Sequence, residues 1–465
     1  MGAFNTTRRA LPLLALLCTA CSLAPVYHRP DVSTPSQFSN AGQFGQAQPA
    51  DDLPKGVWWE IYGDNRLNQL EQQVNANQNL QAALSRLQQA QSALQAQRAT
   101  LFPSLSISAG SQEIQNAMNR ATYVKVVPDR YQDNLLIADV SYEPDVFGRL
   151  SNQVAISRQQ MAASKADLAA LQLSIQAELA ADYFTLQALQ QQQSILTNLV
   201  VNDNQYLLMT RQLYAGGGAA EVDVDEADVV LQNALSQQQD TELQAQTITH
   251  AIALLLGQPA TGFRVITSSS TPRPWVGTRL PSTLLERRPD IASAERQMQA
   301  ANAAIGVAKS AYFPQFILNA QGGYESSQLA NWISAPSELW SLGASAVVAV
   351  FDAGQRQALT EQARQRYQET VANYRATVLN AYREVEDNLS AIKQLDQEYA
   401  SAQHALQSAQ SAAKQADFAY QGGMASYLGV VIAQNQILQA QQQLTSLQTR
   451  RMTASVLLVK ALGGD

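Results

Sequence analysis

Residues that commonly carry catalysis or bind metals are sparse in this chain. It contains three histidines, His28, His250 and His404, which lie far apart in the sequence. None of them has another metal ligand at a recognised motif spacing. The sequence also offers no set of polar groups that would converge in a catalytic pocket. We therefore expect no catalytic residues, no metal site and no cofactor. The sequence thus predicts a protein that is not an enzyme.

Two short stretches are similar in composition to ligand-binding loops but lack residues that those loops require. The acidic run "DVDEADVV" begins at Asp223, but Asp228 stands at the sixth position, where a calcium loop needs glycine. Its twelfth position is Ala234, where the loop needs glutamate. The glycines at 216–218 follow a helical pattern, not a strand, and no Gly-Lys-Ser/Thr follows them. Neither calcium nor a phosphate group is therefore expected.

Composition excludes one partner class and favours long helices. Of the 465 residues, 15% are charged, and the net charge is -7. Because phosphate backbones attract basic patches and none stands out, we expect no nucleic-acid partner. Alanine and glutamine dominate tracts such as Asn79–Ala99, "NLQAALSRLQQAQSALQAQRA". Apolar residues recur there at helical spacing, which favours helices over disorder.

The first residues form a targeting signal. Arg8 and Arg9 precede a short apolar core, and small residues lead to Cys21. This order is typical of a signal peptide, which we place at residues 1–20. The sequence "CTAC" resembles a lipobox, in which Cys21 becomes the lipidated first residue of the mature chain. Acyl chains there would anchor the segment 21–65 to a membrane. An ordinary cleavage site beside a chance cysteine is the alternative.

The remaining chain repeats itself, which indicates a duplication. Similar motifs recur at a nearly constant offset, with five more residues in the first hairpin region. The matched pairs are Phe102 and Phe313, offset by 211 positions, and Gly148 and Gly354, Tyr214 and Tyr420, and Gly257 and Gly463, each offset by 206. We assign the first repeat to 66–283 and the second to 284–465.

Each repeat has the same predicted order of elements. A helix, 66–100 or 284–311, ends before Phe-Pro, because a residue before proline avoids the helical region. A β-hairpin follows at 104–143 or 315–351, and then a long helix and a return helix. Between Gly354 and Gly422 there is neither proline nor glycine, which permits a helix of about 100 Å. Apolar residues recur there every seven positions, which indicates a coiled coil.

The predicted strands alternate apolar and polar residues, so each should have one apolar face. Such faces suit a membrane-embedded barrel, yet four strands are too few to close one. Either several copies share one barrel, or the hairpins cap a soluble coiled-coil protein. The apolar positions are Leu105, Ile107 and Ala109; Leu136, Ala138, Val140 and Tyr142; Phe316, Leu318, Ala320 and Tyr324; and Trp340, Leu342, Ala344, Ala346 and Val348.

Several stretches carry a family resemblance over nearly the whole mature chain. "WWEIYGDNRLNQL" at 58–70, "LLERRPDIASAERQMQAANAAIGVAKSAYFP" at 284–314 and the paired Tyr-x-Gly-Gly turns resemble TolC-like outer-membrane factors. The NodT/OprM-type efflux lipoproteins are the most similar branch. The resemblance implies a mainly α fold with transmembrane β-structure. A homotrimer would share a 12-stranded β-barrel in the bacterial outer membrane, and its coiled coils would form a periplasmic α-barrel.

The family resemblance also implies a function. The chain would be the passive exit duct of a tripartite RND-type pump for drugs or other small solutes. Its partners would be a periplasmic adaptor, an inner-membrane RND transporter and outer-membrane lipid. A lipid-anchored periplasmic adaptor or scaffold remains an alternative, as does the exit duct of a protein-secretion system. Within "LLERRPDIASAER", we expect a group of charged residues to stabilise a helix start and not to catalyse a reaction. They are Arg287, Arg288, Asp290 and Glu295.

The entrance of such a duct would lie at the coiled-coil tips. The resemblance places the tip turns at Tyr214 and Gly217 in the first repeat and at Tyr420 and Gly423 in the second. The constriction of the entrance would be formed either by acids of the first repeat or by apolar side chains of the second. Helix-start acids, favoured by the helix dipole, are an equally weighted alternative. The expected aperture residues are Asp223, Asp225, Glu226, Leu428 and Ile432.

Overall fold

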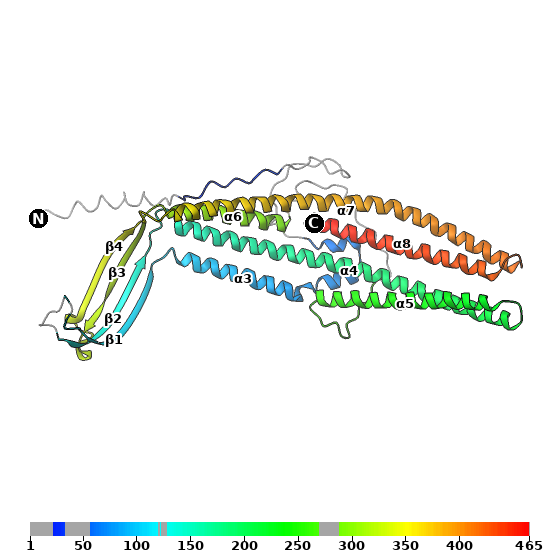
Figure 1. Cartoon of the computed structure of the whole chain (residues 1–465), viewed down its shortest axis with the longest axis horizontal. Helices are drawn as coiled ribbons and strands as arrows, with labels where there is room; N and C mark the ends of the chain where they lie inside the picture. Colours follow the sequence, from blue (N-terminus) through cyan, green and yellow to red (C-terminus); the bar gives the residue numbers. More distant parts are fainter. Residues whose placement is uncertain (1–21, 33–55, 120, 122–127, 269–287, 465) are drawn as a thin grey trace. The chain divides into compact units, whose positions relative to one another are not determined.

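The computed structural model describes residues 22–32, 56–119, 121, 128–268 and 288–464. Figure 1 shows its long helices and its strands. The helices are α2 (Asn65–Glu71), α3 (Gln78–Ala99), α4 (Arg149–Ala215), α5 (Glu221–Leu255), α6 (Pro289–Ser310), α7 (Gln355–Gln421) and α8 (Tyr427–Ala461). The strands are β1 (Ser104–Gln115), β2 (Arg130–Tyr142), β3 (Gln315–Ser326) and β4 (Glu338–Val347). Short 3-10 helices include η1 (Trp58–Tyr62) and η2 (Val74–Ala76).

The structure confirms the internal duplication. Helices α3 and α6 each have 22 residues, and strands β1 and β3 each have 12, in both cases starting 211 positions apart. Helices α4 and α7 each have 67 residues, and α5 and α8 each have 35, with starts 206 positions apart. The two offsets read from the motifs therefore hold along whole elements.

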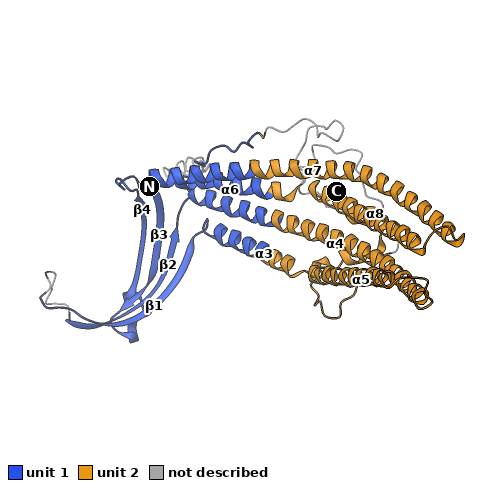
Figure 2. Cartoon of the chain, turned by 45° about the vertical axis from the view of Figure 1, so that its right-hand side comes forward, with its two compact units in different colours: residues 1–31, 86–165, 293–374 blue, residues 32–85, 166–292, 375–465 orange. Residues whose placement is uncertain are grey.

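The chain divides into two compact units, and each contains parts of both repeats (Figure 2). Unit 1 comprises residues 1–31, 86–165 and 293–374, and it holds the sheet. Unit 2 comprises residues 32–85, 166–292 and 375–465, and it holds α5, α8 and both helical turns.

The first predicted helix, 66–100, is not continuous. Helix α2 ends at Glu71, and α3 starts only after Asn77. The Asn77 side chain accepts hydrogen bonds from the backbone N–H groups of Asn79 and Leu80, at 2.9 and 3.3 Å. It also donates to the Leu255 carbonyl at 2.9 Å. This N-cap starts a new helix, because asparagine satisfies otherwise unpaired N–H groups at a helix start.

The second predicted helix, 284–311, corresponds to α6 from Pro289 onwards. Proline suits this first helical position, because its missing N–H would have no partner there. The preceding residues 284–287 lie outside the described part of the chain.

The four strands form one antiparallel sheet in the order β1-β2-β3-β4. Residues opposite each other in an antiparallel pair point to the same side. By this register, Leu105, Leu136, Leu318 and Leu342 share one face of the sheet. The expected alternation of apolar and polar faces is therefore continuous across all four strands. Strands β1 and β4 form the edges of the sheet within the described chain.

Unit 2 has an aromatic core around the start of α2. Asp64 caps α2 by accepting from the N–H groups of Arg66 and Leu67. Its other carboxylate oxygen accepts from the Tyr183 hydroxyl at 2.9 Å. Tyr183 and Phe184 are fully buried in the same cluster, with Trp58, Trp59 and Tyr62 packed against them. The stretch "WWEIYGDNRL" therefore has a structural role.

Across the described residues, no helix is long and apolar enough to cross a membrane.

The end of α5 depends on a glycine that the duplication repeats. Gly257 has φ +67°, and a Cβ there would collide with the Ala76 carbonyl beside the Asn77 cap. Gly262 has a similar φ of +78° but open space around it. At both positions, an alanine with positive φ would destabilise the protein by about 1 kcal/mol. At position 257 the collision would also force the backbone to move, which destabilises the protein further.

We predict that Gly257→Ala destabilises the protein by about 3 kcal/mol and the matched variant Gly262→Ala by about 1 kcal/mol. Chemical denaturation followed by helical circular dichroism measures both. Equal losses would show that the approach of Ala76 to Gly257 is unimportant.

Candidate functional site

The two helical turns of unit 2 have the same geometry. Helix α4 ends at Ala215 and α5 begins at Glu221, whereas α7 ends at Gln421 and α8 begins at Tyr427. Gly217 and Gly423 both have left-handed backbone, with φ +75° and +71°. In each turn the N–H of this glycine donates to a tyrosine carbonyl, that of Tyr214 or Tyr420. A left-handed glycine is a common way to end a helix, since it lacks the Cβ that strains this conformation.

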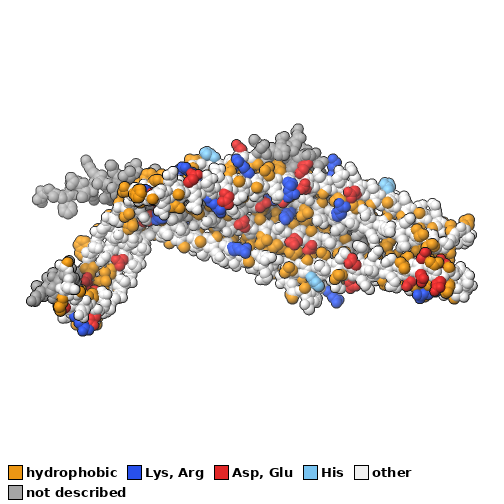
Figure 3. Space-filling view, viewed as in Figure 1, with side chains coloured by type: hydrophobic (Ala, Val, Ile, Leu, Met, Phe, Trp, Pro, Cys, Tyr) orange, Lys and Arg blue, Asp and Glu red, His pale blue; other side chains and the backbone are white. Residues whose placement is uncertain are grey.

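The acids of the first repeat lie on the first turns of α5. Asp223 accepts a hydrogen bond from the Ala220 N–H at 2.8 Å, which stabilises the helix start. Asp225 and Glu226 are exposed. Acidic side chains gather at this end of α5 (Figure 3). Asp223 thus stabilises the start of α5, whereas the carboxylates of Asp225 and Glu226 face solvent.

The equivalent end of α8 presents apolar side chains. Leu428 and Ile432 lie one helical turn apart and are 40% and 51% exposed. Val430 and Val431, between them in sequence, are buried. The two repeats therefore share one backbone plan but offer different chemistry at their tips.

A tyrosine cluster joins the two repeats near these turns, and sequence reasoning missed it. The rings of Tyr206 and Tyr427 lie 5.2 Å apart, and those of Tyr420 and Tyr427 lie 5.0 Å apart. The Tyr420 hydroxyl also donates to Met209 Sδ at 3.5 Å. Tyr206 packs in one apolar cluster with Leu231 of α5, among others. The cluster therefore ties α4, α5, α7 and α8 together.

A buried acid lies beside this cluster. Asp203 of α4 is 3% exposed, and its Oδ2 has no hydrogen-bond partner among the described residues. Burial raises the pKa of Asp203 to about 6. Burial also raises the pKa of Tyr427, and the charges of Tyr420, Asp417, Tyr206 and, least of these, Asp203 add to this effect. An uncompensated carboxylate inside a coiled coil is costly, so this position favours the protonated acid.

Two of the residues in "RRPDIASAER" have the structural role expected from the sequence. Arg288 is 6% exposed and forms a two-armed pair with Asp290, at 3.0 and 2.7 Å. It also donates to the Ala461 carbonyl at 3.0 Å and lies 2.8 Å from Glu384. The arginine thereby connects the start of α6 with α7 and the end of α8. A single buried cation is stable here because two carboxylates and a carbonyl surround it.

Glu295 has a different role from the one expected. It accepts from the Tyr27 hydroxyl at 3.3 Å and lies 3.7 Å from the Arg29 guanidinium. Asn302 in the same helix donates to the Pro25 carbonyl at 2.8 Å. Within unit 1, these contacts hold the segment 22–31 against the part of α6 that starts at residue 293. Sequence reasoning missed them because the partners lie more than 260 positions apart.

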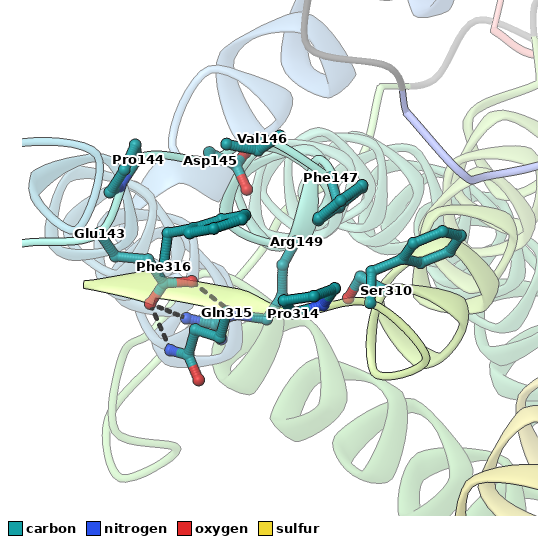
Figure 4. Close-up of a pocket in the computed structure, with 11 residues that line it drawn as sticks. Glu143, Pro144, Asp145, Val146, Phe147, Arg149, Ser310, Pro314, Gln315 and Phe316 are labelled. Carbon is teal, nitrogen blue, oxygen red and sulfur yellow. Dashed lines mark hydrogen bonds and ion pairs between the residues drawn. The ribbon is translucent and has the colours of Figure 1, made fainter. Parts of the chain in front are cut away.

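A small pocket in unit 1 marks the junction of strand and helix. Glu143 accepts two hydrogen bonds from Arg149 and one from Gln315, as Figure 4 shows. Phe147 stacks on Phe313 with ring centroids 4.6 Å apart. The pocket holds about 30 Å³, which is room for about one water molecule. The pocket is therefore too small to hold a solute, and its residues stabilise the connection between strand and helix.

Comparisons with known proteins agree over nearly the whole chain. A family model described as outer membrane efflux protein matches residues 70–258 and 280–464. The cation efflux system protein CusC of Escherichia coli strain K12 is 30% identical over 456 residues, which cover 97% of this chain and 98% of that protein. The outer membrane protein OprJ of Pseudomonas aeruginosa is 30% identical over 458 residues, covering 97% and 94%.

Solved structures agree with the fold. The outer-membrane channel OprN superposes with a TM-score of 0.85 at 27% identity, over 96% of this chain and 99% of that one. CusC superposes with a TM-score of 0.84, also at 27% identity, over 96% and 100%. The resemblance read from the sequence motifs is thus confirmed, and the chain belongs to the outer membrane efflux protein family.

Proposed function

We propose that this efflux channel works as a homotrimer and as the passive exit duct of a tripartite RND-type pump. A periplasmic adaptor and an inner-membrane RND transporter would engage its coiled-coil tips and supply the energy. The chain itself would carry out no catalysis and need no cofactor. Its cargo would be drugs or other small solutes, and it would contact outer-membrane lipid but no nucleic acid.

The sheet is the observation that carries this proposal. It has one apolar face, on which Leu105 and Leu342 are 67% and 78% exposed, and two unpaired edges. A strand edge in lipid leaves N–H and C=O groups without partners, so a membrane-embedded sheet must close on itself. Three copies with four strands each would supply the twelve strands of a shared barrel.

The domain division proposed from the sequence fits this duct. Residues 1–20 would be the signal peptide, 21–65 the lipidated segment, and 66–283 and 284–465 the two repeats. Cys21 lies outside the described residues. The residues directly after it are held in unit 1, where the Ser22 hydroxyl donates to Asn152 Oδ1 at 2.9 Å. A Cβ on Gly306 would lie 2.8 Å from the Ala24 nitrogen, which indicates close packing. This support favours a lipid anchor at Cys21.

The tips would form the periplasmic entrance. Asp225 and Glu226 are exposed near the first turn, and Leu428 and Ile432 near the second. Repeated around a three-fold axis, the acids would favour cations, and the apolar side chains would narrow the opening. With Asp223 at the helix start, these residues form the proposed aperture.

Relatives support efflux and leave the cargo open. They are named for cations, for pyoverdine and for toluene, at 29 to 30% identity to this chain. These names favour efflux over protein secretion. Such varied names on one fold favour a duct that does not select its cargo.

Single-channel recording in a lipid bilayer tests the duct and its entrance. Wild-type protein should give small discrete conductance steps, and Leu428→Ala should enlarge them. The double variant Asp225→Asn with Glu226→Gln should lower the cation-to-anion permeability ratio by about twofold or more.

Glu242→Gln is the matched control for these aperture variants, because Glu242 is an exposed acid farther along α5. It should leave the permeability ratio unchanged. A protein that gives no conductance steps would contradict the duct. If Glu242→Gln shifted the ratio as much as the aperture variants do, the acids would not line the entrance.

Asp203 makes the packing of the tip depend on pH. Burial raises its pKa from an ordinary value near 3.8 to about 6. The packed tip therefore binds a proton that the loosened tip releases. Packing is strongest below about pH 4 and weakens as pH rises through about 6.

We predict that Asp203→Asn stabilises the packed tip at pH 7.5 by about 1 to 3 kcal/mol and has little effect at pH 4. Hydrogen–deuterium exchange of tip peptides, corrected for the intrinsic effect of pH, measures the local opening free energy. Glu242→Gln, at an exposed acid farther along α5 from the turn, is the control and should change neither value. Equal protection of wild type and Asp203→Asn at pH 7.5 would refute the prediction.

A further inference from the structure

The sheet has a second face, opposite the apolar one, which we call the polar face. Because side chains alternate along a strand, this face carries the residues that lie between the apolar positions. Residues opposite each other in the register share a row across it. From β1 to β4 the rows include Ser106, Asp139, Gln321 and Ser341; Ser108, Ile137, Gly323 and Leu339; and Gly110, Leu135 and Glu325, the last of these rows ending at β3.

The polar face carries acids and no base. Asp133 and Asp139 lie on it in β2, and Glu325 lies on it in β3. The single basic residue within the four described strands is Arg130, which lies on the opposite face and pairs there with Glu113 at 2.6 Å. The polar face therefore has a net negative charge.

Two of these acids have no partner for their carboxylates. Asp139 is half-buried and Glu325 is exposed. Neither side chain forms a hydrogen bond or an ion pair with another described residue. Asp133, by contrast, accepts a hydrogen bond from the side chain of Gln112 at 3.2 Å. The carboxylates of Asp139 and Glu325 are therefore available to attract a cation.

The surface between these two acids is apolar. Ile137 and Leu339 occupy the row between those of Asp139 and Glu325, and Leu135 lies in the row of Glu325. Leu135 and Leu339 are half-buried, so part of each side chain remains accessible. The rows of Asp139 and Glu325 are separated by about 14 Å along the strands. One ligand can thus contact a carboxylate and hydrocarbon at the same time.

We propose that the polar face is a docking surface for organic cations that have an apolar body. The charged nitrogen lies against Asp139 or Glu325, and the hydrocarbon lies against Leu135 and Leu339. This inference rests on the proposed duct, in which the apolar face meets lipid and the polar face lines the lumen. It names a class of cargo that the sheet favours, at a place separate from the tips.

Charge complementarity selects this class of ligand. Anions are disfavoured, because the polar face offers acids and no base. Hard cations such as Mg²⁺ need several oxygen ligands at once, whereas Asp139 and Glu325 lie too far apart to share an ion. Within the described chain, no group of three or more acids, histidines or cysteines is placed to hold a metal ion. An alkylammonium ion needs only one carboxylate and gains further from the burial of its hydrocarbon.

The docking is expected to be weak, as a duct requires. An ion pair near water stabilises a complex only slightly, and half-buried leucines cover only part of a ligand. Conduction depends on sites that a solute enters readily and also leaves readily. The polar face would therefore raise the local concentration of organic cations without retaining them.

Block of ion current by tetraalkylammonium ions tests this surface in the full-length protein. Tetramethylammonium and tetrabutylammonium chloride are added in turn to each side of a bilayer that contains single channels. Wild-type channels should be half-blocked by tetrabutylammonium at a concentration about tenfold lower than by tetramethylammonium, because only the longer chains reach the leucines. Asp139→Asn should raise the half-blocking concentration of tetrabutylammonium about threefold to fivefold.

A second variant separates the apolar contribution from the charge. Leu339→Ser should reduce the advantage of tetrabutylammonium and leave the weak block by tetramethylammonium unchanged. Unaltered conductance of each variant in the absence of blocker shows that the channel has folded and inserted.

Glu338→Gln is the matched control. Glu338 directly precedes Leu339 in β4, but it lies opposite Tyr324 on the apolar side of the sheet. Its replacement removes one acid per chain, as Asp139→Asn does, and should leave both half-blocking concentrations unchanged. The double variant Asp225→Asn with Glu226→Gln should also keep the preference for tetrabutylammonium, because its changes lie at the tip.

Each contrary result has a distinct meaning. Equal block by the two ions in the wild type would overturn the docking of an apolar body. Equal shifts in Asp139→Asn and Glu338→Gln, or loss of the preference in the tip variant, would overturn the assignment to the polar face. All three results would leave the conducting duct intact, whereas a protein without conductance would overturn both the duct and this inference.

Discussion

The structure depends on one constraint, which is that backbone N–H and C=O groups in lipid need hydrogen-bond partners. Inside the chain, β2 and β3 satisfy this requirement on both sides, whereas β1 and β4 each leave one edge open. Exposed edges are a liability in any sheet, and here they border an apolar face. The four-stranded sheet is therefore incomplete as a membrane element, and in the proposed homotrimer the other copies of the chain complete it.

The internal duplication explains why the chain has two edge strands in its sheet and two similar turns at the ends of its long helices. The equal lengths of α4 and α7, and of α5 and α8, keep the two turns equivalent. Side chains then diverge on this common backbone, with acids following Gly217 and apolar residues following Gly423. The tyrosine cluster and Asp203 lie where the helices of both repeats meet. Their packing provides a physical link between opening of the tip and the protonation of one buried acid.

Much of this architecture could be predicted from the sequence, because it depends on patterns among residues that are close together in the chain. Period-two alternation indicated the strands, the absence of proline and glycine indicated the long helices, and repeated glycines indicated the turns. The break at Asn77 was missed, because its partner Leu255 lies 178 positions away. The Tyr206–Tyr427 contact was missed for the same reason, since aromatic residues on an apolar face do not reveal which distant helix they will meet. Glu295 was assigned to a helix start, but long-range contacts use it to hold Tyr27 and Arg29.

The most direct test of the central claim is the native mass of the full-length protein released from detergent. If open sheet edges force the copies together, the spectrum will contain assemblies of three chains and no stable single chain. A single chain that remains folded and dispersed without detergent would contradict this account, because its sheet edges would then need no partner.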